Sequence, residues 1–418
     1  MRLTLNLGAL SALNVGLTFA FQWYLLTKIG AGIETDALFA SMTVPQVVLA
    51  IVSGAVVSVL VPLLAGELVE YRRREAWFFC GLMIVFFGGL SALLILLAHW
   101  WVPLMVPGFA GAALDLCIGL TRIQLVGLVF FAINAVQLAY HQADGRLAWA
   151  EFIQVAGNLA ALAALVWLLP SHGVLAAAWI LSGRIMLQVL LLAPGMGWPS
   201  VSSADSQTLR VAWQRIQPLL IGNAYFKTDP LIDRYLLSTA SSGTMSLFYL
   251  AQQIHLAAVQ VINKAIAAPI VAPLSAYHKS QDFSAFRHLC RQRLTVTWVL
   301  SVCGVLFILF FGESVLNLIF GGGSLSSADV QTLWFILLWL AGVFVGAIGG
   351  QICASIFYAC GNTVTPTRMS VITFTVYVPL KIIGFLVWGL PGLAISTSLY
   401  FISNFAIQLV LLKRSGIL

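Results

Sequence analysis

The stretch AWFFCGLMIVFFGGLSALLILLAHWWVP, residues 76–103, decides the fold class of this chain. It contains no Lys, Arg, Asp or Glu, and three arginines, Arg72–Arg74, stand shortly before it. About 20 apolar residues in a helix cross the ~30 Å hydrocarbon core of a bilayer. Of all 418 residues, 61% are hydrophobic and 8% are charged, whereas about 25% of the residues in a soluble domain are charged. The sequence therefore predicts an integral membrane protein.

Apolar runs of spanning length recur along the chain, between short stretches that hold nearly all of the charge. The runs lack the strict apolar and polar alternation of transmembrane strands, so we predict an all-α membrane protein. About 12 transmembrane helices are expected, which places both termini on one side of the membrane. The predicted spans are residues 5–28, 36–65, 76–103, 113–140, 147–169, 173–194, 211–238, 245–275, 290–318, 329–359, 367–388 and 391–412.

The net charge of +7 is explained by the positions of the basic residues. Most of the 21 Lys and Arg residues stand on the side of the two termini. By the positive-inside rule this side is cytoplasmic, so both termini are predicted to be cytoplasmic. No nucleic-acid partner is needed to account for the charge. The basic residues on this side are Arg2, Arg72, Arg73, Arg74, Arg146, Arg210, Arg215, Lys279, Arg287, Arg291, Arg293, Arg368, Lys413 and Arg414.

The second half of the sequence repeats the first at an offset of 211 residues, which places Tyr24 on Tyr235 and Gly32 on Gly243. Prolines, glycines and tryptophans recur in order, which argues against chance similarity between apolar segments. We predict an N-terminal six-helix lobe over residues 1–197, a cytoplasmic linker over 198–210 and a C-terminal six-helix lobe over 211–418. Two parallel six-helix halves are typical of transporters.

The seventh predicted span carries the most ionisable residues, which are expensive near the bilayer centre and therefore suggest function. Lys227 and Asp229 are predicted to face a substrate cavity. Pro230 removes a backbone hydrogen bond and predicts a kinked or hinged helix. Asp233, Arg234 and Pro230 are predicted to serve gating or ion coupling, and a merely interfacial position is the alternative for Asp233 and Arg234.

Basic residues within other spans are Arg122, Arg184, Lys264 and Lys381. Several cations around one cavity would suit an anionic substrate such as a phosphate or pyrophosphate. We predict that Arg184, Lys264 and Arg122 belong to this cavity. Arg122 and Lys381 stand nearer helix ends, where snorkelling to the interface or pairing with an acid is favoured over a place in the cavity.

Asp36 begins the second span directly after Gly30–Gly32. An acid at this place is expected to cap its own helix, and a gating or coupling role is predicted in addition. His255, a lone histidine in the eighth span, is expected to be a satisfied polar residue of the bundle.

The sequence indicates neither an enzyme nor a metal site. It contains no Ser/His/Asp arrangement, no HExxH pattern, no phosphate-binding loop and no sizeable domain outside the membrane that could hold an ATPase. The six cysteines are scattered and are expected to act as small hydrophobes. We therefore expect no cofactor, and transport would run on a proton or sodium gradient or on the membrane potential.

Three segments resemble MurJ/MviN-type lipid II flippases: GAGIETDALFA (residues 30–40) with VPLLA (61–65), LIDRYLL (231–237), and YACGNTVTP (358–366). The resemblance implies the fold of the multidrug/oligosaccharidyl-lipid/polysaccharide exporter superfamily, with two lobes that form a V around a cationic cavity and alternate between inward-open and outward-open states. It also implies a bacterial inner-membrane location and an undecaprenyl-pyrophosphate-linked saccharide as substrate. A monomer is expected.

The chain departs from this family at its cavity arginines. The matching places hold Phe21, the Leu49–Ala50 region and Gln253, whereas the acid of the second helix corresponds to Asp36. The departure favours a relative that serves another lipid-linked glycan, or one whose cavity cations are Lys227, Lys264 and Arg184.

Three other functions remain open at this level. A multidrug antiporter of the same superfamily would need an acidic, aromatic cavity, for which Asp229 and Asp233 are candidates. A membrane-embedded glycosyltransferase, ligase or polymerase would need a large outer loop, whereas the predicted outer connections are short. A scaffold that does not transport is the third.

Overall fold

A computed structural model describes residues 2–199 and 206–417 of the chain, and within these ranges every regular element is helical. This result confirms the predicted all-α class. The contacts divide the chain into two compact units, unit 1 (Met1–Met245) and unit 2 (Ser246–Leu418).

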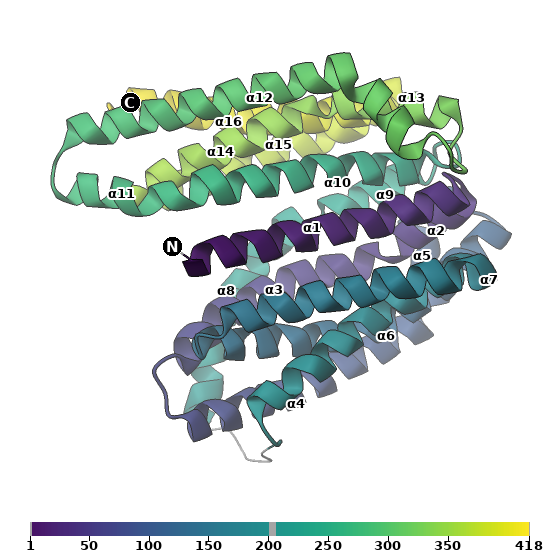
Figure 1. Cartoon of the computed structure of the whole chain (residues 1–418), viewed down its shortest axis with the longest axis horizontal. Helices are drawn as coiled ribbons and strands as arrows, with labels where there is room; N and C mark the ends of the chain where they lie inside the picture. Colours follow the sequence, from purple (N-terminus) through teal and green to yellow (C-terminus); the bar gives the residue numbers. More distant parts are fainter. Residues whose placement is uncertain (1, 200–205, 418) are drawn as a thin grey trace. The chain divides into compact units, whose positions relative to one another are not determined.

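The described part of unit 1 is a bundle of helices, which Figure 1 shows in purple, blue and teal. It contains α1 (Arg2–Ile29), α2 (Ile33–Ser41), α3 (Thr43–Leu64), α4 (Val69–Leu96), α5 (Ala98–Met105), α6 (Ala112–Ala143), α7 (Leu147–Met196), α8 (Ser206–Lys227) and α9 (Asp229–Leu237).

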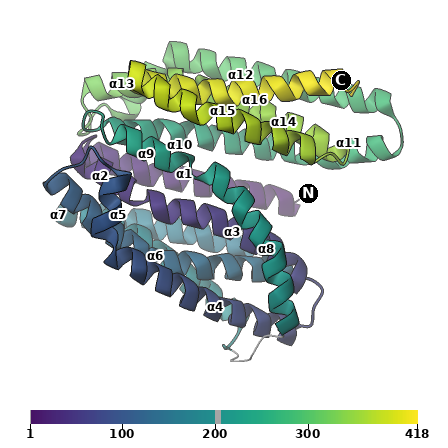
Figure 2. The same cartoon turned by 180° about the vertical axis from the view of Figure 1, so that it is seen from behind.

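Helix α6 lies at the centre of this bundle and packs against α2, α3, α4 and α7. Helix α1 packs on α7, and α8 runs obliquely across α3 (Figure 2). Burial of apolar side chains where α3, α4, α6 and α8 meet forms one core of the unit, with Leu60, Ala76 and Val136 fully buried. Because α8 and α9 pack on α3, they belong to unit 1 by contact, whereas the lobe boundary at residues 198–210 follows from the sequence repeat and stays a prediction.

Helix α7 is a long element that folds back on itself. Its 50 residues would extend about 75 Å if straight, more than twice the thickness of a hydrocarbon core. Gly173 interrupts it with φ 56° and ψ −145°, a conformation in which glycine is favoured. Arg184 Nη1 donates a 2.6 Å hydrogen bond to Asn158 Oδ1 across the break. The two parts of α7, residues 147–172 and 174–196, therefore lie side by side.

Unit 2 is a second helical bundle, coloured green to yellow in Figures 1 and 2. After α10 (Thr244–Ile262), which begins two residues before the unit boundary, its described elements are the π-helical turn η1 (Asn263–Ala267), α11 (Ala268–Lys279), α12 (Phe283–Phe320), α13 (Ser327–Trp339), α14 (Ala341–Ala359), α15 (Val364–Trp388) and α16 (Leu390–Arg414).

Glycines allow α14 and α16 to approach each other closely. A Cβ at Gly342 would lie 2.6 Å from Ser398 Cβ, and one at Gly346 would meet the backbone of Phe401. Small residues at such contacts are typical of membrane helix pairs, because packing replaces the hydrophobic driving force there. Helix α15 packs on the other side of α16.

Ten helical segments of the described chain are long and apolar enough to cross a membrane, so the protein is a multi-pass membrane protein. The predicted spans 147–169 and 173–194 form one of the ten, because they correspond to the two parts of α7. The predicted span 211–238 corresponds to α8 and α9, which are not among the ten. The count of twelve stays a prediction.

Candidate functional site

The loop before α2 is fixed by the hydroxyl of Thr35. This hydroxyl accepts a 3.0 Å hydrogen bond from Gly32 N and donates to Gly30 O at 3.1 Å. Thr35 is fully buried and thereby satisfies a backbone N–H at the start of α2, a role expected for Asp36. The Asp36 side chain, only 3% exposed, reaches a distant segment instead.

Asp36 Oδ2 accepts a 2.6 Å hydrogen bond from the backbone N–H of Gly243, directly before α10. Gly243 has φ +86°, and a Cβ added there would lie 2.8 Å from Ala31 O. Only glycine fits this conformation and this close approach without strain. Because Gly243 is the repeat equivalent of Gly32, the two repeat-related loops meet at this contact.

Two more hydrogen bonds support the same arrangement. Arg234 on α9 donates from Nε to Thr43 Oγ1 at 3.2 Å. Gly108, after α5, donates from its backbone N–H to Ser238 Oγ at 3.2 Å. We call these three pairs, Asp36–Gly243, Thr43–Arg234 and Gly108–Ser238, the α2–α9 latch. All of its members lie in unit 1.

Asp233 and Arg234 are 1% and 3% exposed, so the structure places both side chains inside the protein rather than at an interface with water. Both residues lie on α9, which a break at Thr228 separates from α8. Pro230 stands in the first turn of α9, where its missing N–H leaves no hydrogen bond unmade. The predicted interruption of the seventh span at Pro230 is confirmed.

The two residues predicted for the substrate cavity on this span lie outside the latch. Lys227 ends α8 and is exposed, and Asp229 begins α9 and is half-buried. They precede the latch residue Arg234 by one to two helical turns.

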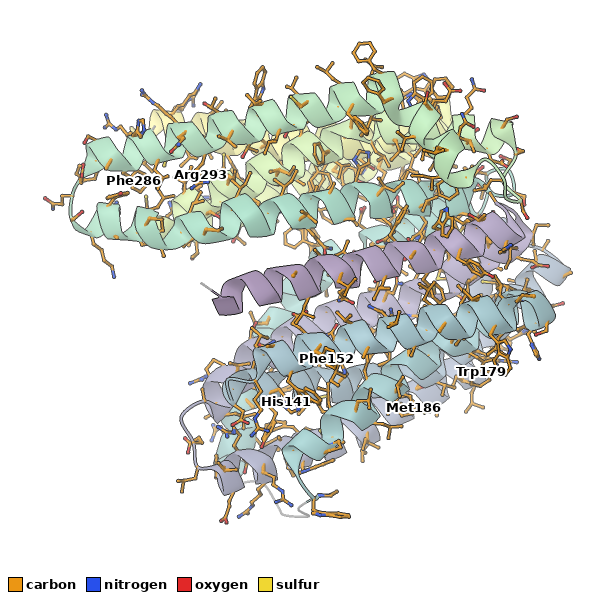
Figure 3. All side chains as sticks on the ribbon, viewed as in Figure 1. His141, Phe152, Trp179, Met186, Phe286 and Arg293 are labelled. Carbon is orange, nitrogen blue, oxygen red and sulfur yellow. The ribbon has the colours of Figure 1, made fainter. Side chains whose placement is uncertain are left out.

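The predicted cavity cations on α6 and α7 differ in their surroundings. Arg184 bonds to Asn158, and Asn158 in turn bonds to Asn14 on α1. This polar ladder lies between the two parts of α7, which carry the labelled Phe152 and Met186 in Figure 3. Arg122 on α6 is exposed. Neither arginine belongs to the latch.

The remaining ionisable candidates belong to unit 2. Lys264 falls in the η1 turn, and its side chain lies outside the described part of the structure. His255 Nε2 contacts Leu337 O at 3.0 Å and is 2% exposed, in agreement with a satisfied bundle residue. Lys381 is fully buried, with Nζ 5.0 Å from the Tyr377 ring centroid. Snorkelling of Lys381 to an interface, expected from its place near a helix end, is therefore wrong.

Sequence reasoning found Asp36 and Arg234 but missed their partners. Thr43 looked like an ordinary residue of a continuous span, although Pro45 in the first turn of α3 was a signal for the junction of α2 and α3 at Met42. Gly243 carried a signal, since the repeat pairs it with Gly32. In the described residues no group of three or more His, Cys, Asp or Glu side chains could hold a metal ion.

The sequence matches the family model "Lipid II flippase MurJ" over residues 25–418. A probable lipid II flippase MurJ of Vibrio cholerae is 23% identical over 323 residues, 74% of this chain and 60% of the relative. The lipid II flippase MurJ of Burkholderia cenocepacia is 22% identical, with 93% and 79% covered. The chain thus spans less than two thirds of the Vibrio relative.

Two solved structures share the fold. A lipid II flippase MurJ in an inward closed conformation superposes with a TM-score of 0.83 at 17% identity, covering 97% of this chain and 87% of that one. An inward-facing MATE multidrug transporter gives 0.82 at 14% identity, covering 97% and 94%. The family model accounts for nearly the whole sequence, and so this chain belongs to the MurJ lipid II flippase family.

Proposed function

We propose that this protein is a flippase that moves lipid II, or a related undecaprenyl-pyrophosphate-linked saccharide, from the cytoplasmic to the periplasmic leaflet. The match to the MurJ family over residues 25–418 carries this proposal. The membrane-spanning helices and the MurJ-like fold support it. The proposed location is the bacterial inner membrane, with both termini in the cytoplasm and a monomer as the working unit.

The substrate-binding residues remain those predicted from the sequence. Lys227 and Asp229 at the break between α8 and α9 are proposed to contact the charged headgroup, with Arg184, Lys264 and Arg122 as further cations. The exposure of Lys227 supports this role, because a residue at a broken helix can reach a ligand without unfolding its neighbours. A proton or sodium gradient, or the membrane potential, is proposed to drive the cycle.

The α2–α9 latch is proposed to act as the outer gate. Alternating access requires a contact that forms in one state and breaks in the other. A hydrogen bond to a charged group contributes about 1.5–3 kcal/mol, which changes a two-state equilibrium by about ten- to a hundredfold. The bond from Gly243 N–H to the Asp36 carboxylate meets this description. Asp233, Arg234 and Pro230 support the gate from α9.

The test is complementation in a bacterium depleted of its own flippase. Cells are scored for growth and for the fraction of lipid-linked saccharide that a membrane-impermeant reagent can reach from outside. Wild type is expected to restore both. Lys227→Ala and Asp229→Ala are expected to lose headgroup binding and fail to restore them.

Asp36 variants test the gate. Asp36→Ala removes the acceptor and leaves a buried N–H unpaired, so the fraction reached from outside should fall by about tenfold or more. Asp36→Asn keeps an acceptor oxygen without the charge and should retain an intermediate activity. Glu34→Ala serves as the control, because Glu34 is an exposed acid in the same first turn of α2 and lies outside the latch. Equal activity of Asp36→Ala and wild type would remove the latch from the mechanism.

The TM-score of 0.82 to a multidrug transporter makes a drug antiporter the second candidate. The bacterium depleted of its own flippase also distinguishes between these two functions. A fall in drug sensitivity on expression, without any change in lipid-linked saccharide, would replace the flippase by the antiporter.

A further inference from the structure

Unit 1 contains an apolar pocket of about 570 Å³ between α3, α4 and α8. Its size falls within the range of ligand pockets in proteins, about 300–1,000 Å³. Figure 2 shows how α8 crosses α3 at this place. The pocket is lined by Val52, Val56, Phe79, Leu82, Met83, Phe86, Phe87, Leu209, Arg210, Ala212, Trp213, Ile216 and Leu220.

The pocket has a rigid floor and an open rim. Val56, Phe79 and Ile216 on the floor are at most 8% exposed and belong to the core where α3, α4, α6 and α8 meet. At the rim, Phe86 and Trp213 are 62% and 57% exposed. A rim of exposed apolar side chains offers an apolar surface to a lipid chain at the open side of this pocket.

Arg210 is the only charged side chain among the lining residues. It stands in the second turn of α8, which begins at Ser206, so the charge lies at one end of an otherwise apolar cavity. The sequence places the start of this helix on the cytoplasmic side. An apolar cavity with a guanidinium at its end, at headgroup depth, is complementary to a lipid with an apolar chain and an anionic headgroup.

We propose that this pocket binds an anionic glycerophospholipid of the cytoplasmic leaflet, with an acyl chain against the floor and the phosphate on Arg210. One guanidinium matches one phosphodiester, whereas a pyrophosphate-linked carrier holds more charge than a single arginine neutralises. The site is distinct from the proposed transport site and shares no residue with it. The bound lipid contacts α8, α3 and α4 together and thereby stabilises the position of α8, which ends at the break at Thr228.

A second groove in the same protein provides an internal comparison. Helices α15 and α16 form an apolar groove of about 430 Å³ in unit 2, lined by residues such as Val376, Leu380 and Leu399. No charged side chain is among its lining residues. Lipid in this groove is expected to show no preference for an anionic headgroup.

The test uses purified full-length protein in mild detergent, titrated with phosphatidylglycerol or phosphatidylcholine and examined by native mass spectrometry. Wild type is expected to bind one phosphatidylglycerol at least tenfold more tightly than phosphatidylcholine. Arg210→Gln should lose this preference, and Arg210→Lys should keep part of it. Leu82→Trp narrows the rim at a position that is itself exposed, and it should weaken the binding of both lipids.

Arg215→Gln is the matched control, because Arg215 is an exposed arginine on the same helix that does not line the pocket. An equal loss in Arg210→Gln and Arg215→Gln would mean general attraction to a basic surface and would overturn the site. Unchanged lipid binding by Leu82→Trp would overturn the site as well. So would a dimer of the wild-type chain that dissociates in Leu82→Trp, because a second copy would then occupy the pocket. The measurement needs no transport, so its outcome is independent of the flippase proposal.

Discussion

The bond between Asp36 and Gly243 joins a side chain to a backbone group, and the two ends therefore depend on sequence in different ways. Asp36 supplies the acceptor through its carboxylate, whereas Gly243 supplies the donor through its main chain. Gly243 matters because its left-handed conformation and its contact with Ala31 O leave no space for a Cβ. This bond of the latch thus requires an acid at residue 36 and a glycine at residue 243.

We expect Gly243→Ala to destabilise the protein by at least about 1–2 kcal/mol, because an L-residue in the left-handed region costs that much before the clash with Ala31 O is added. Gly32→Ala is the matched control at the repeat-equivalent position. Gly32 has φ −170°, and a Cβ there would meet nothing within 4 Å. Thermal unfolding of both purified variants measures the difference in stability. Equal unfolding midpoints would show that the contact of Gly243 does not contribute to stability.

Single residues show where sequence reasoning succeeds and where it stops. Asp36, Asp233 and Arg234 were identified because charge within an apolar segment is conspicuous, and the structure buries all three. Snorkelling of Lys381 to an interface was a wrong expectation, because neighbouring helices cover its side chain on α15. The hydrogen-bond partner of Asp36 is a backbone N–H, which no residue type reveals.

Helix interruptions at the scale of elements were predictable only where a special residue causes them. Pro230 indicated the break between α8 and α9. The junctions at Met42 and Leu340 were not predicted, because both residues keep near-helical dihedral angles, although Pro45 in the first turn of α3 was a signal for the first of them. Gly173, the first residue of the predicted span 173–194, marks the turn-back of α7.

The start of α12 is stabilised by a titratable cap, and its stability should depend on pH. Asp282 accepts hydrogen bonds from Ala285 N at 3.0 Å and from Ser284 Oγ at 2.9 Å. These two bonds, that from Ala285 first, hold the pKa of the Asp282 carboxyl below its ordinary value. The carboxylate therefore stabilises the helix start at pH above about 3.9, and this contribution is lost as the pH falls through the lower pKa of the folded state.

Hydrogen exchange of the first-turn amides of α12 tests this cap. Asp282→Ala should lower their protection at neutral pH, because the acceptor for Ala285 N is removed. Asp282→Asn keeps an acceptor that does not titrate, so its protection should stay constant where that of wild type falls on acidification. A parallel decline in wild type and Asp282→Asn would assign the pH dependence to another group.

At the scale of the whole molecule, the fold was predictable because the bilayer allows few solutions. Span length, positive charge on one side and the repeat indicated a helical bundle, and the all-helical units confirm this class. The assignment of α8 and α9 to unit 1 was not predictable from the repeat, since it depends on packing against α3.

The fold-back of α7 decides the topology of everything after it. If the two parts of α7, the α8–α9 segment and the α10–α11 segment each cross the bilayer once, the turn at Ser171–Gly173 faces the side opposite to the turn at Ser280–Gln281. A short epitope inserted after Ser171 should then be reached by antibody from the periplasm of cells with a permeabilised outer membrane. The same epitope after Ser280 should stay protected until the inner membrane is opened. Protection of both epitopes would contradict two crossings by α7.

The contact between Asp36 and the Gly243 N–H also determines what genetics can find. A random screen can delete the carboxylate by changing one codon, but no substitution deletes a backbone N–H except proline, which would distort the loop as well. Loss-of-function alleles that spare folding should therefore accumulate at codon 36 and be rare at codon 243. Compensating alleles should be recovered in the surroundings of the loop and never as a charge exchanged between the two positions.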